Sequence, residues 1–252
     1  MPTVMPDRWR ATDNSQGTND MIEAPANLTI KATLRRPSEA QIAAFQGCPT
    51  GFAVDAMMGR GALSPAIQPI GGGRDLRCVA AGPALTADCG PADVLASFAA
   101  LKFLRPGDIV VAAHGGHRDA AALGDRLAGM MKNGRAAGFV TDGPVRDYDG
   151  IIPVDLPIWC AGVTPASPHM SGPGSVGFPV QIGGQEVETG DMIVADRDGV
   201  VVVPFEQLDA VIAKLDHIRA LEGDLDAKVA NGLVVPEWVE EYLASDQTEV
   251  TD

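Results

Sequence analysis

The residues best suited to chemistry are three charged side chains, each within a few positions of a glycine in the sequence. Arg146 and Asp147 lie in TDGPVRDYDG (141–150), and Asp125 precedes Arg146 with twenty residues between them. Arginine stays charged at any physiological pH and binds a carboxylate through two parallel donors. Aspartate oxygens are the hard ligands that Mg²⁺ or Mn²⁺ prefers, with water and substrate completing the coordination. This combination suits a small oxo acid chelated to a divalent cation.

On its own, the Arg146–Asp147 pair is more typical of a solvated turn, because exposed ion pairs are common and stabilise little. Its place in the chain favours a functional role. The β-branched run DIVVAA (108–113) predicts a strand, GDRLAGMMKNG (124–134) predicts a helix, and AAGFVT (136–141) predicts a second strand. A strand, a helix and a strand with short joints make a βαβ unit with parallel strands.

Such a βαβ unit would bring the distant residues together. The carboxyl ends of both strands and the start of the helix lie on one edge, where open α/β sheets bind ligands. There the backbone amides of Asp125, Arg126 and Leu127 are expected to be unpaired donors that can bind a carboxylate or an oxyanion. Gly124 would let the backbone approach a ligand closely. We therefore expect residues 124–127 to bind substrate together with Arg146.

The rest of the pattern predicts a single α/β domain over residues 26–245 with a β-rich second half, after a flexible leader at 1–25 and before an acidic tail at 246–252. The other predicted elements are short helices at 38–46, capped by Ser38, and around 54–61; a strand at about 76–81 that breaks at Gly82-Pro83; a helix from Pro91 to Pro106; a strand at 156–163; a Gly/Pro-rich loop at 164–177; a hairpin that turns at 196–199; a long amphipathic helix from Phe205; and a last helix at 236–244.

Composition excludes several classes of function. The net charge of −14, with only five lysines, argues against binding to nucleic acid or to an anionic membrane, since both need a basic footprint. No apolar run approaches the roughly 20 residues that span a bilayer, and the N-terminus lacks the apolar core of a signal peptide. The four cysteines show no CxxC pairing, so we expect neither a disulfide framework nor a zinc site, and a cytoplasmic location.

The segments PGDIVVAAHGG, LGDRLA, GRAAGFVTDGPVRDYD and VQIGGQEVETGDMIVADRDGVVVVP together resemble the RraA-like family, over roughly residues 50–220. This family includes metal-dependent 4-hydroxy-4-methyl-2-oxoglutarate aldolases, which are marked by an aspartate, twenty residues and then Arg-Asp. Asp125, Arg146 and Asp147 fit that spacing. The resemblance implies an α/β fold, a β/β/α swivelling-type sandwich with a central βαβ unit, assembled as a homotrimer or homohexamer with sites between subunits.

By the same resemblance, Asp147 anchors Mg²⁺, Mn²⁺ or another divalent cation, largely through water, and Arg146 contacts the substrate and its enolate. The amides from Asp125 to Leu127 hold the pyruvyl carboxylate, and the Asp125 side chain orients a water for proton transfer. The C-terminal helix, which carries Glu222, reaches a neighbouring subunit's site, although no local motif fixes that residue. The implied activity is a class II type aldolase that cleaves a small 4-hydroxy-2-oxo acid to pyruvate and a second carbonyl compound through a metal-stabilised enolate.

Three other functions stay open. Oxaloacetate decarboxylation passes through the same enolate and would use the same site. A non-catalytic regulator would instead use the acidic surface to bind a basic segment of a ribonuclease. A phosphohistidine carrier would use His114 or His117, but the expected Thr/Gly-rich run before the histidine is not found. These histidines depart from the family's loop and could tune substrate choice or contact the metal. A Schiff-base route needs a lysine beside the keto carbon, and none of the five lies in the motif loops.

Overall fold

The structure is a computed structural model that describes residues 26–251. The leader expected at residues 1–25 lies outside these residues. The predicted βαβ unit is confirmed, because strands β4 (Ile109–Ala113) and β5 (Gly138–Thr141) run parallel and helix α4 (Asp125–Asn133) connects them.

Within the described residues, the largest sheet has nine strands. Its neighbours follow the order β1-β7-β3-β4-β5-β6-β2, and β10 pairs with β3 and with β11. The run β3 to β6 is parallel, whereas β10 joins β3 and β11 in antiparallel pairs that confirm the predicted hairpin. The remaining strands are β1 (Leu28–Ile30), β2 (Gln68–Pro69), β3 (Ala80–Asp88), β6 (Ile158–Cys160), β7 (Gly174–Val176), β10 (Met192–Ala195) and β11 (Val200–Val203), with β8 (Val180–Ile182) and β9 (Gln185–Val187) in a separate hairpin.

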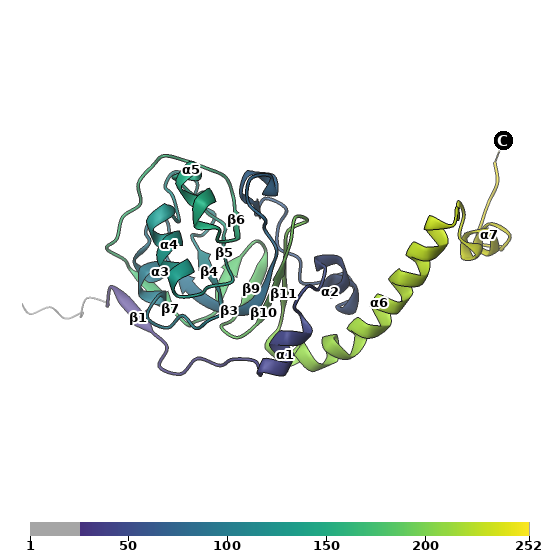
Figure 1. Cartoon of the computed structure of the whole chain (residues 1–252), viewed down its shortest axis with the longest axis horizontal. Helices are drawn as coiled ribbons and strands as arrows, with labels where there is room; N and C mark the ends of the chain where they lie inside the picture. Colours follow the sequence, from purple (N-terminus) through teal and green to yellow (C-terminus); the bar gives the residue numbers. More distant parts are fainter. Residues whose placement is uncertain (1–25, 252) are drawn as a thin grey trace, which may run out of the picture.

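Helices lie on two sides of this sheet (Figure 1). Helices α3, α4 and α5 gather beside the parallel strands, and α1, α2 and the start of α6 lie beside β10 and β11. The capping box predicted at Ser38 is present. The helices other than α4 are α1 (Glu39–Ala44), α2 (Thr50–Ala56), α3 (Leu95–Ala100), α5 (Tyr148–Ile151), α6 (Leu208–Ala230) and α7 (Glu237–Leu243), with short 3-10 turns at Ile70–Gly73, Ile152–Val154 and Phe205–Gln207.

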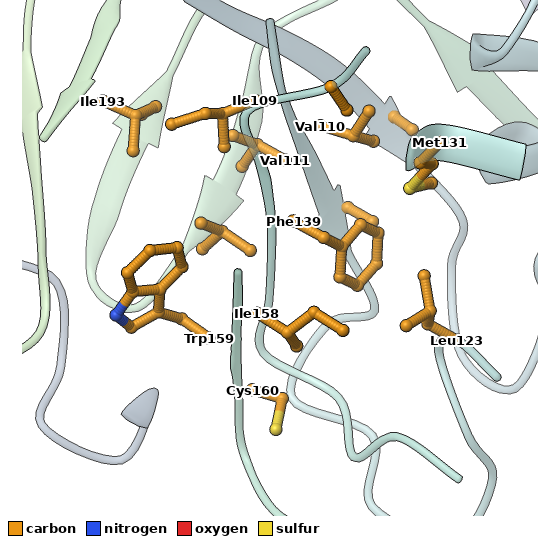
Figure 2. Packing of buried hydrophobic residues seen from close by; sticks show 14 of the residues in the cluster. Ile109, Val110, Val111, Leu123, Met131, Phe139, Ile158, Trp159, Cys160 and Ile193 are labelled. Atoms are coloured by element: carbon orange, nitrogen blue, oxygen red, sulfur yellow. The ribbon is translucent and has the colours of Figure 1, made fainter. Parts of the chain in front are cut away.

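Strand β4 is buried on both faces. In Figure 2, Ile109 and Val111 point to the side where Trp159 lies, whereas Val110 points toward Met131 of α4. This alternation is the two-residue period of a strand, and all five residues of β4 are buried. The continuous apolar run is therefore what a parallel strand covered on both faces requires. The loops that carry the candidate residues follow the carboxyl ends of β4 and β5.

Several predicted element bounds are wrong. Strand β3 runs through Gly82-Pro83, pairing with β10 over its first half and with β4 over its second half. Proline has no N–H to donate, and here it stands where the strand exchanges one partner for the other. Any side chain at Gly82 would collide with the carbonyl of Gly107, so this glycine serves a close backbone contact.

The helix expected from Pro91 to Pro106 is reduced to α3. Ala92 has a left-handed backbone with φ of 60°, and Asp93 accepts a hydrogen bond from the Leu95 amide, so a turn replaces the first helical residues. Three further bounds differ: α2 begins before the predicted position, β6 is shorter than 156–163, and β7 falls inside the loop predicted at 164–177.

The C-terminal part of the chain leaves the body of the molecule. Helix α6 buries Leu208, Val211 and Leu215 and then continues into solvent, with α7 at its far end (Figure 1). We call residues 219–251 the C-terminal arm. It exposes many large apolar side chains, including Leu221, Leu225, Val229, Val235, Trp238, Tyr242 and Leu243. Between residues 26 and 251, no helix combines the length and apolar character needed to cross a membrane.

Candidate active site

Two loops at the carboxyl ends of β4 and β5 are hydrogen-bonded to each other. The Ala122 amide donates to the Pro144 carbonyl at 2.7 Å, and the Arg146 amide donates to the Leu123 carbonyl at 2.9 Å. The turn that carries Arg146 is therefore held directly beside the start of α4. The βαβ topology predicts this close approach of residues that lie far apart in the sequence.

Gly124 is the point where the candidate residues come together. A methyl group at this position would lie 2.6 Å from Oδ2 of Asp147 and 3.1 Å from Nε of Arg146, which is closer than van der Waals contact allows. Gly124 precedes α4 in an extended conformation, with φ of −127°. Glycine is thus required here for close approach and not for an unusual backbone angle.

Contacts on two sides fix the guanidinium of Arg146. Its Nε lies 3.2 Å from Oδ2 of Asp147, and its Nη1 donates to the hydroxyl of Ser167 at 2.8 Å. The side chains of Arg146 and Asp147 remain 36% and 42% exposed, so both can meet a ligand. Asp147 also has a left-handed backbone with φ of 60°. Such a conformation is uncommon outside glycine and tends to occur at functional sites.

Asp125 caps its own helix. Its Oδ1 accepts a hydrogen bond from the Arg126 amide at 2.7 Å, and its carboxylate packs against Gly150, where a methyl group would lie 2.8 Å from Oδ2. The expectation that the amides of residues 125–127 are unpaired is therefore wrong for Arg126. The physical reason is that Gly124 has no side chain to cap the helix, so the next carboxylate satisfies one of the free N–H groups.

A cavity of about 310 Å³ opens beside these residues. All five predicted substrate-binding residues line it, namely Gly124, Asp125, Arg126, Leu127 and Arg146. Asp147 is not among the lining residues, although its carboxylate lies against Gly124 and Arg146. The other lining residues are Val94, Phe98, Leu123, Ser167, Pro168 and Met170.

The loop that carries Ser167 is pinned to the turn before α3. Buried Asp93 accepts hydrogen bonds from the amides of Leu95 (2.8 Å), Ser171 (2.7 Å) and Gly172 (2.9 Å). Burial alone would raise the pKa of Asp93, but these donors stabilise the carboxylate and the pKa falls below its ordinary value. In addition, the Val94 amide donates to the His169 carbonyl at 3.0 Å.

Sequence analysis did not identify Ser167, Asp93, Phe98 or Met170 as site residues. Their placement depends on contacts between segments about 75 residues apart. The one available signal was the length of the Gly/Pro-rich loop at 164–177, since long loops in compact domains are often functional.

The two histidines of the loop after β4 do not reach the cavity. His114 is only 1% exposed, and burial lowers the pKa of its imidazole, so the ring is neutral at physiological pH. Its backbone amide and that of Gly116 donate to the carboxylate of Asp142 at 2.6 and 2.7 Å. His117 is half-buried and also absent from the lining. A direct metal or substrate contact by either histidine is not supported within this chain, and buried His114 is not placed as a phosphoacceptor.

The comparison with protein families decides the classification. A family model described as RraA-like, Aldolase/RraA, matches residues 50–202, which is more than half of the chain and includes the whole βαβ unit. The chain belongs to the RraA-like family. The α/β fold implied by the sequence resemblance, with its central βαβ unit, is thereby confirmed.

The relatives and solved structures to which this chain is similar carry different names. A protein from Halalkalibacterium halodurans named "Putative 4-hydroxy-4-methyl-2-oxoglutarate aldolase" is 35% identical over 179 residues, or 71% of this chain and 83% of its own. Among solved structures, RraAS2 from Streptomyces coelicolor, titled an unusual member of the RNase ES inhibitor RraA protein family, is 29% identical with a TM-score of 0.66, covering 76% of this chain and 98% of its own. An uncharacterized protein from Pseudomonas syringae pv. tomato has a TM-score of 0.68 at 21% identity, covering 79% of this chain and 96% of its own, a likeness of fold alone.

Proposed function

We propose that this protein is a divalent-metal-dependent aldolase that cleaves a 4-hydroxy-2-oxo acid, such as 4-hydroxy-4-methyl-2-oxoglutarate, to pyruvate and a second carbonyl compound. The observation that carries the proposal is the packing of Arg146 and Asp147 against Gly124 at the start of α4, beside a cavity of about 310 Å³. The name of the relative from H. halodurans supports the same reaction class.

The carboxylate of Asp147 suits a hard divalent cation such as Mg²⁺ or Mn²⁺. No group of three or more His, Cys, Asp or Glu side chains among residues 26–251 is placed to hold a metal. Mg²⁺ does not need such a group, because it commonly keeps several waters and uses one or two carboxylates with substrate oxygens. Asp147, exposed beside the cavity, fits that donor set. When bound, the cation supplies Lewis-acid polarisation of the substrate's 2-oxo group.

Arg146 binds the 2-oxo acid end of the substrate. Its fork of donors matches a carboxylate, and its fixed positive charge stabilises the negative charge that develops when the carbon–carbon bond breaks. Ser167 and Asp147 hold the guanidinium in place before substrate arrives, so little reorganisation is needed during the reaction. This pre-organisation is the chain's own contribution to the rate.

Asp125 is the acid–base group for the proton of the substrate's 4-hydroxyl. A substrate carboxylate at the start of α4 competes for the Arg126 amide that Asp125 now occupies, and its binding frees the Asp125 carboxylate to act through a water. The 4-hydroxyl passes its proton through that water to the Asp125 carboxylate, which later returns it to C3. The C3–C4 bond breaks, and the C4 oxygen becomes the carbonyl of the second product. The bonding electron pair moves to C3 as pyruvate enolate, and protonation at C3 completes pyruvate.

Oxaloacetate decarboxylation is the second activity proposed for this site. Loss of CO₂ from oxaloacetate breaks the equivalent C3–C4 bond and leaves the same enolate, so Arg146 serves both reactions. Steady-state rates of pyruvate release, measured with Mg²⁺ on 4-hydroxy-4-methyl-2-oxoglutarate and on oxaloacetate, test both proposals. Arg146→Ala is expected to lower kcat/KM by on the order of a hundredfold, whereas Arg60→Ala, outside the cavity, is expected to have no effect. Failure of the unaltered protein on both substrates would contradict both activities.

A regulatory role is the candidate function from a different class. The net charge of −14 and the likeness to a structure titled as a member of an RNase inhibitor family favour binding to a basic segment of a ribonuclease. Such binding would weaken as salt is raised and would persist in Asp147→Ala, whereas lyase activity would be lost in that variant. Measuring both properties on the same variant separates the two functions.

We also propose that copies of the chain assemble, as a homotrimer or homohexamer, through the C-terminal arm. Trp238, Leu225 and the other apolar side chains of the arm have no cover within the described chain, and large exposed apolar patches mark interaction sites. Light scattering should show an oligomer that a Leu225→Glu, Trp238→Ala double variant disrupts. A monomeric unaltered protein would contradict this assembly.

The four described cysteines are free and buried, which suits the reducing cytoplasm proposed for the protein.

A further inference from the structure

The cavity beside Arg146 carries more positive than negative charge. Among its described lining residues, the cations are Arg146 and Arg126, and the anion is Asp125. The chain as a whole has the opposite balance, with 33 acidic and 19 basic residues. Arg146 is already paired with Asp147, which lies outside the lining. Arg126 therefore provides a second position in the cavity at which an anionic group of a ligand can bind.

The side chain of Arg126 is not neutralised by its own helix. Side chains three and four residues apart contact one another on a helix, and those positions hold Gly129 and Met130. The neighbouring carboxylate of Asp125 accepts a hydrogen bond from the backbone amide of Arg126. The ion pairs formed among residues 26–251 do not include Arg126. Its guanidinium, on an exposed residue, is thus available to a ligand.

Helix geometry directs this side chain toward the site. Arg126 is the second residue of α4, and side chains of a helix lean toward its N-terminus. Arg126 therefore extends toward the start of α4, where Gly124 lies against the side chains of Arg146 and Asp147. Arg126 and Arg146 come from two different loops and helices but line one cavity of about 310 Å³. A small molecule in this cavity can contact both guanidinium groups.

The chemistry of the substrate fits this pair of arginines. In 4-hydroxy-4-methyl-2-oxoglutarate, C4 carries both the hydroxyl that loses its proton and the second carboxylate. A group that binds this carboxylate must lie close to the group that takes the proton. Asp125 and Arg126 are consecutive residues in the first turn of α4. The apolar side chains of Val94 and Phe98 line the same cavity, and they strengthen an ion pair there by lowering the local dielectric constant.

We propose that the Arg126 side chain is a specificity-determining residue that binds the second carboxylate of a 4-hydroxy-2-oxo dicarboxylic acid. The inference rests on the proposed aldolase function and assigns one residue to the far end of its substrate. The second carboxylate takes no part in the cleavage and leaves unchanged on the second carbonyl product. The ion pair with Arg126 therefore persists in the transition state, so its loss lowers kcat/KM.

A matched pair of substrates tests the proposal. 4-Hydroxy-4-methyl-2-oxoglutarate and 4-hydroxy-4-methyl-2-oxopentanoate differ in a carboxylate against a methyl group on C4. The measurement is kcat/KM for pyruvate release with Mg²⁺, expressed as the ratio of the dicarboxylic to the monocarboxylic substrate. Arg126→Met is expected to lower this ratio by about tenfold or more, and Arg126→Lys by less, because lysine keeps the charge. Any effect of the substitution on the helix itself is common to both substrates and cancels in the ratio.

Arg77→Met is the control. It removes the same charge from an exposed residue outside the cavity and should leave the ratio unchanged. A ratio that Arg126→Met does not lower, or that Arg77→Met lowers equally, would overturn the assignment of Arg126 and leave the aldolase function standing. Failure of the unaltered protein to release pyruvate from either substrate would contradict the aldolase function itself and the inference with it.

Discussion

Arg146 donates a 2.8 Å hydrogen bond from Nη1 to the hydroxyl of Ser167, which lies 21 residues further along the chain. Ser167 belongs to a loop, whereas Arg146 follows a buried strand of the central sheet. The loop that carries Ser167 is tied down through Asp93. The orientation of the guanidinium thus depends on a segment outside the βαβ unit, which also accepts a hydrogen bond from the Ala121 amide at the Ala166 carbonyl.

Replacing Ser167 with alanine is expected to lower kcat/KM for pyruvate release by about five- to tenfold, because a hydrogen bond to a charged group contributes on the order of 1 kcal/mol at an exposed site. Ser167→Thr keeps a hydroxyl and should restore most of the activity. Ser64→Ala, which removes a turn hydroxyl outside the cavity, is the control. Equal kinetics for Ser167→Ala and the unaltered protein would remove the positioning role of Ser167.

Gly124→Ala tests the close contact at the start of α4. The added methyl group would overlap Asp147 Oδ2 and crowd Arg146 Nε, so we expect kcat/KM to fall on the order of a hundredfold through displacement of both groups. Gly129→Ala is a matched control on the same helix, because nothing lies within 4 Å of the added methyl group. That control should keep full activity and raise the free energy of unfolding by about 0.5–1 kcal/mol. Similar activity losses in both variants would contradict the claim that close contact at Gly124 positions Arg146 and Asp147.

Much of this arrangement could be predicted from the sequence. The β-branched run of β4 and the Gly124 and Gly134 that bound α4 identify the βαβ unit, and parallel topology then brings Asp125 near Arg146. These signals are local and strong, since a buried parallel strand and a capped amphipathic helix each leave a clear residue pattern.

The loop contacts could not be predicted in the same way. Ser167 reaches Arg146 because Asp93 binds the backbone of residues 171 and 172, and no local pattern links two segments so far apart. The Pro91 start of a helix was a reasonable signal, but the carboxylate of Asp93 and the left-handed Ala92 favour a turn there. Tertiary hydrogen bonds overrode local helix propensity at this point.

Asp93→Asn should destabilise the protein and change how its stability depends on pH. The lowered pKa of Asp93 means that the unfolded chain binds a proton more readily than the folded one. The stabilisation is therefore complete above the unfolded value near 3.9 and is lost as pH falls through the folded pKa. Because an amide group cannot accept from all the backbone donors, Asp93→Asn should lower the free energy of unfolding at neutral pH by about 1–3 kcal/mol. Urea unfolding at pH 7 and in acid measures both effects.

The matched control for that experiment is Asp88→Asn, which alters an exposed aspartate that accepts from Gly90. It should change the free energy of unfolding by less than about 0.5 kcal/mol. A loss equal to that of Asp93→Asn would show that the buried donors have no special effect. The activity of Asp93→Asn should also fall, since the Ser167 loop is released.

Buried His114 is expected to make the protein less stable as pH falls below neutrality. Desolvation lowers the pKa of the folded imidazole, with partial opposition from the Ala112 carbonyl and Asp142. The unfolded chain is then protonated first, so stability is complete above the unfolded pKa near 6.5 and declines as pH falls toward the folded value. His114→Gln should flatten this part of the stability profile, and His117→Gln should not. An unchanged slope in His114→Gln would contradict the assignment.

The central claim, that Asp147 supports a metal-dependent cleavage at this site, is tested most directly by the rate of pyruvate release with Mg²⁺, with a chelator, and after Mg²⁺ is restored. Asparagine tolerates the left-handed backbone at this position, so Asp147→Asn removes the charge without forcing a change of fold. We predict that the chelator abolishes activity reversibly. We also predict that Asp147→Asn lowers the rate of pyruvate release on the order of a hundredfold or more while retaining the unfolding midpoint of the unaltered protein. Pyruvate release that neither the chelator nor Asp147→Asn reduces would contradict the account.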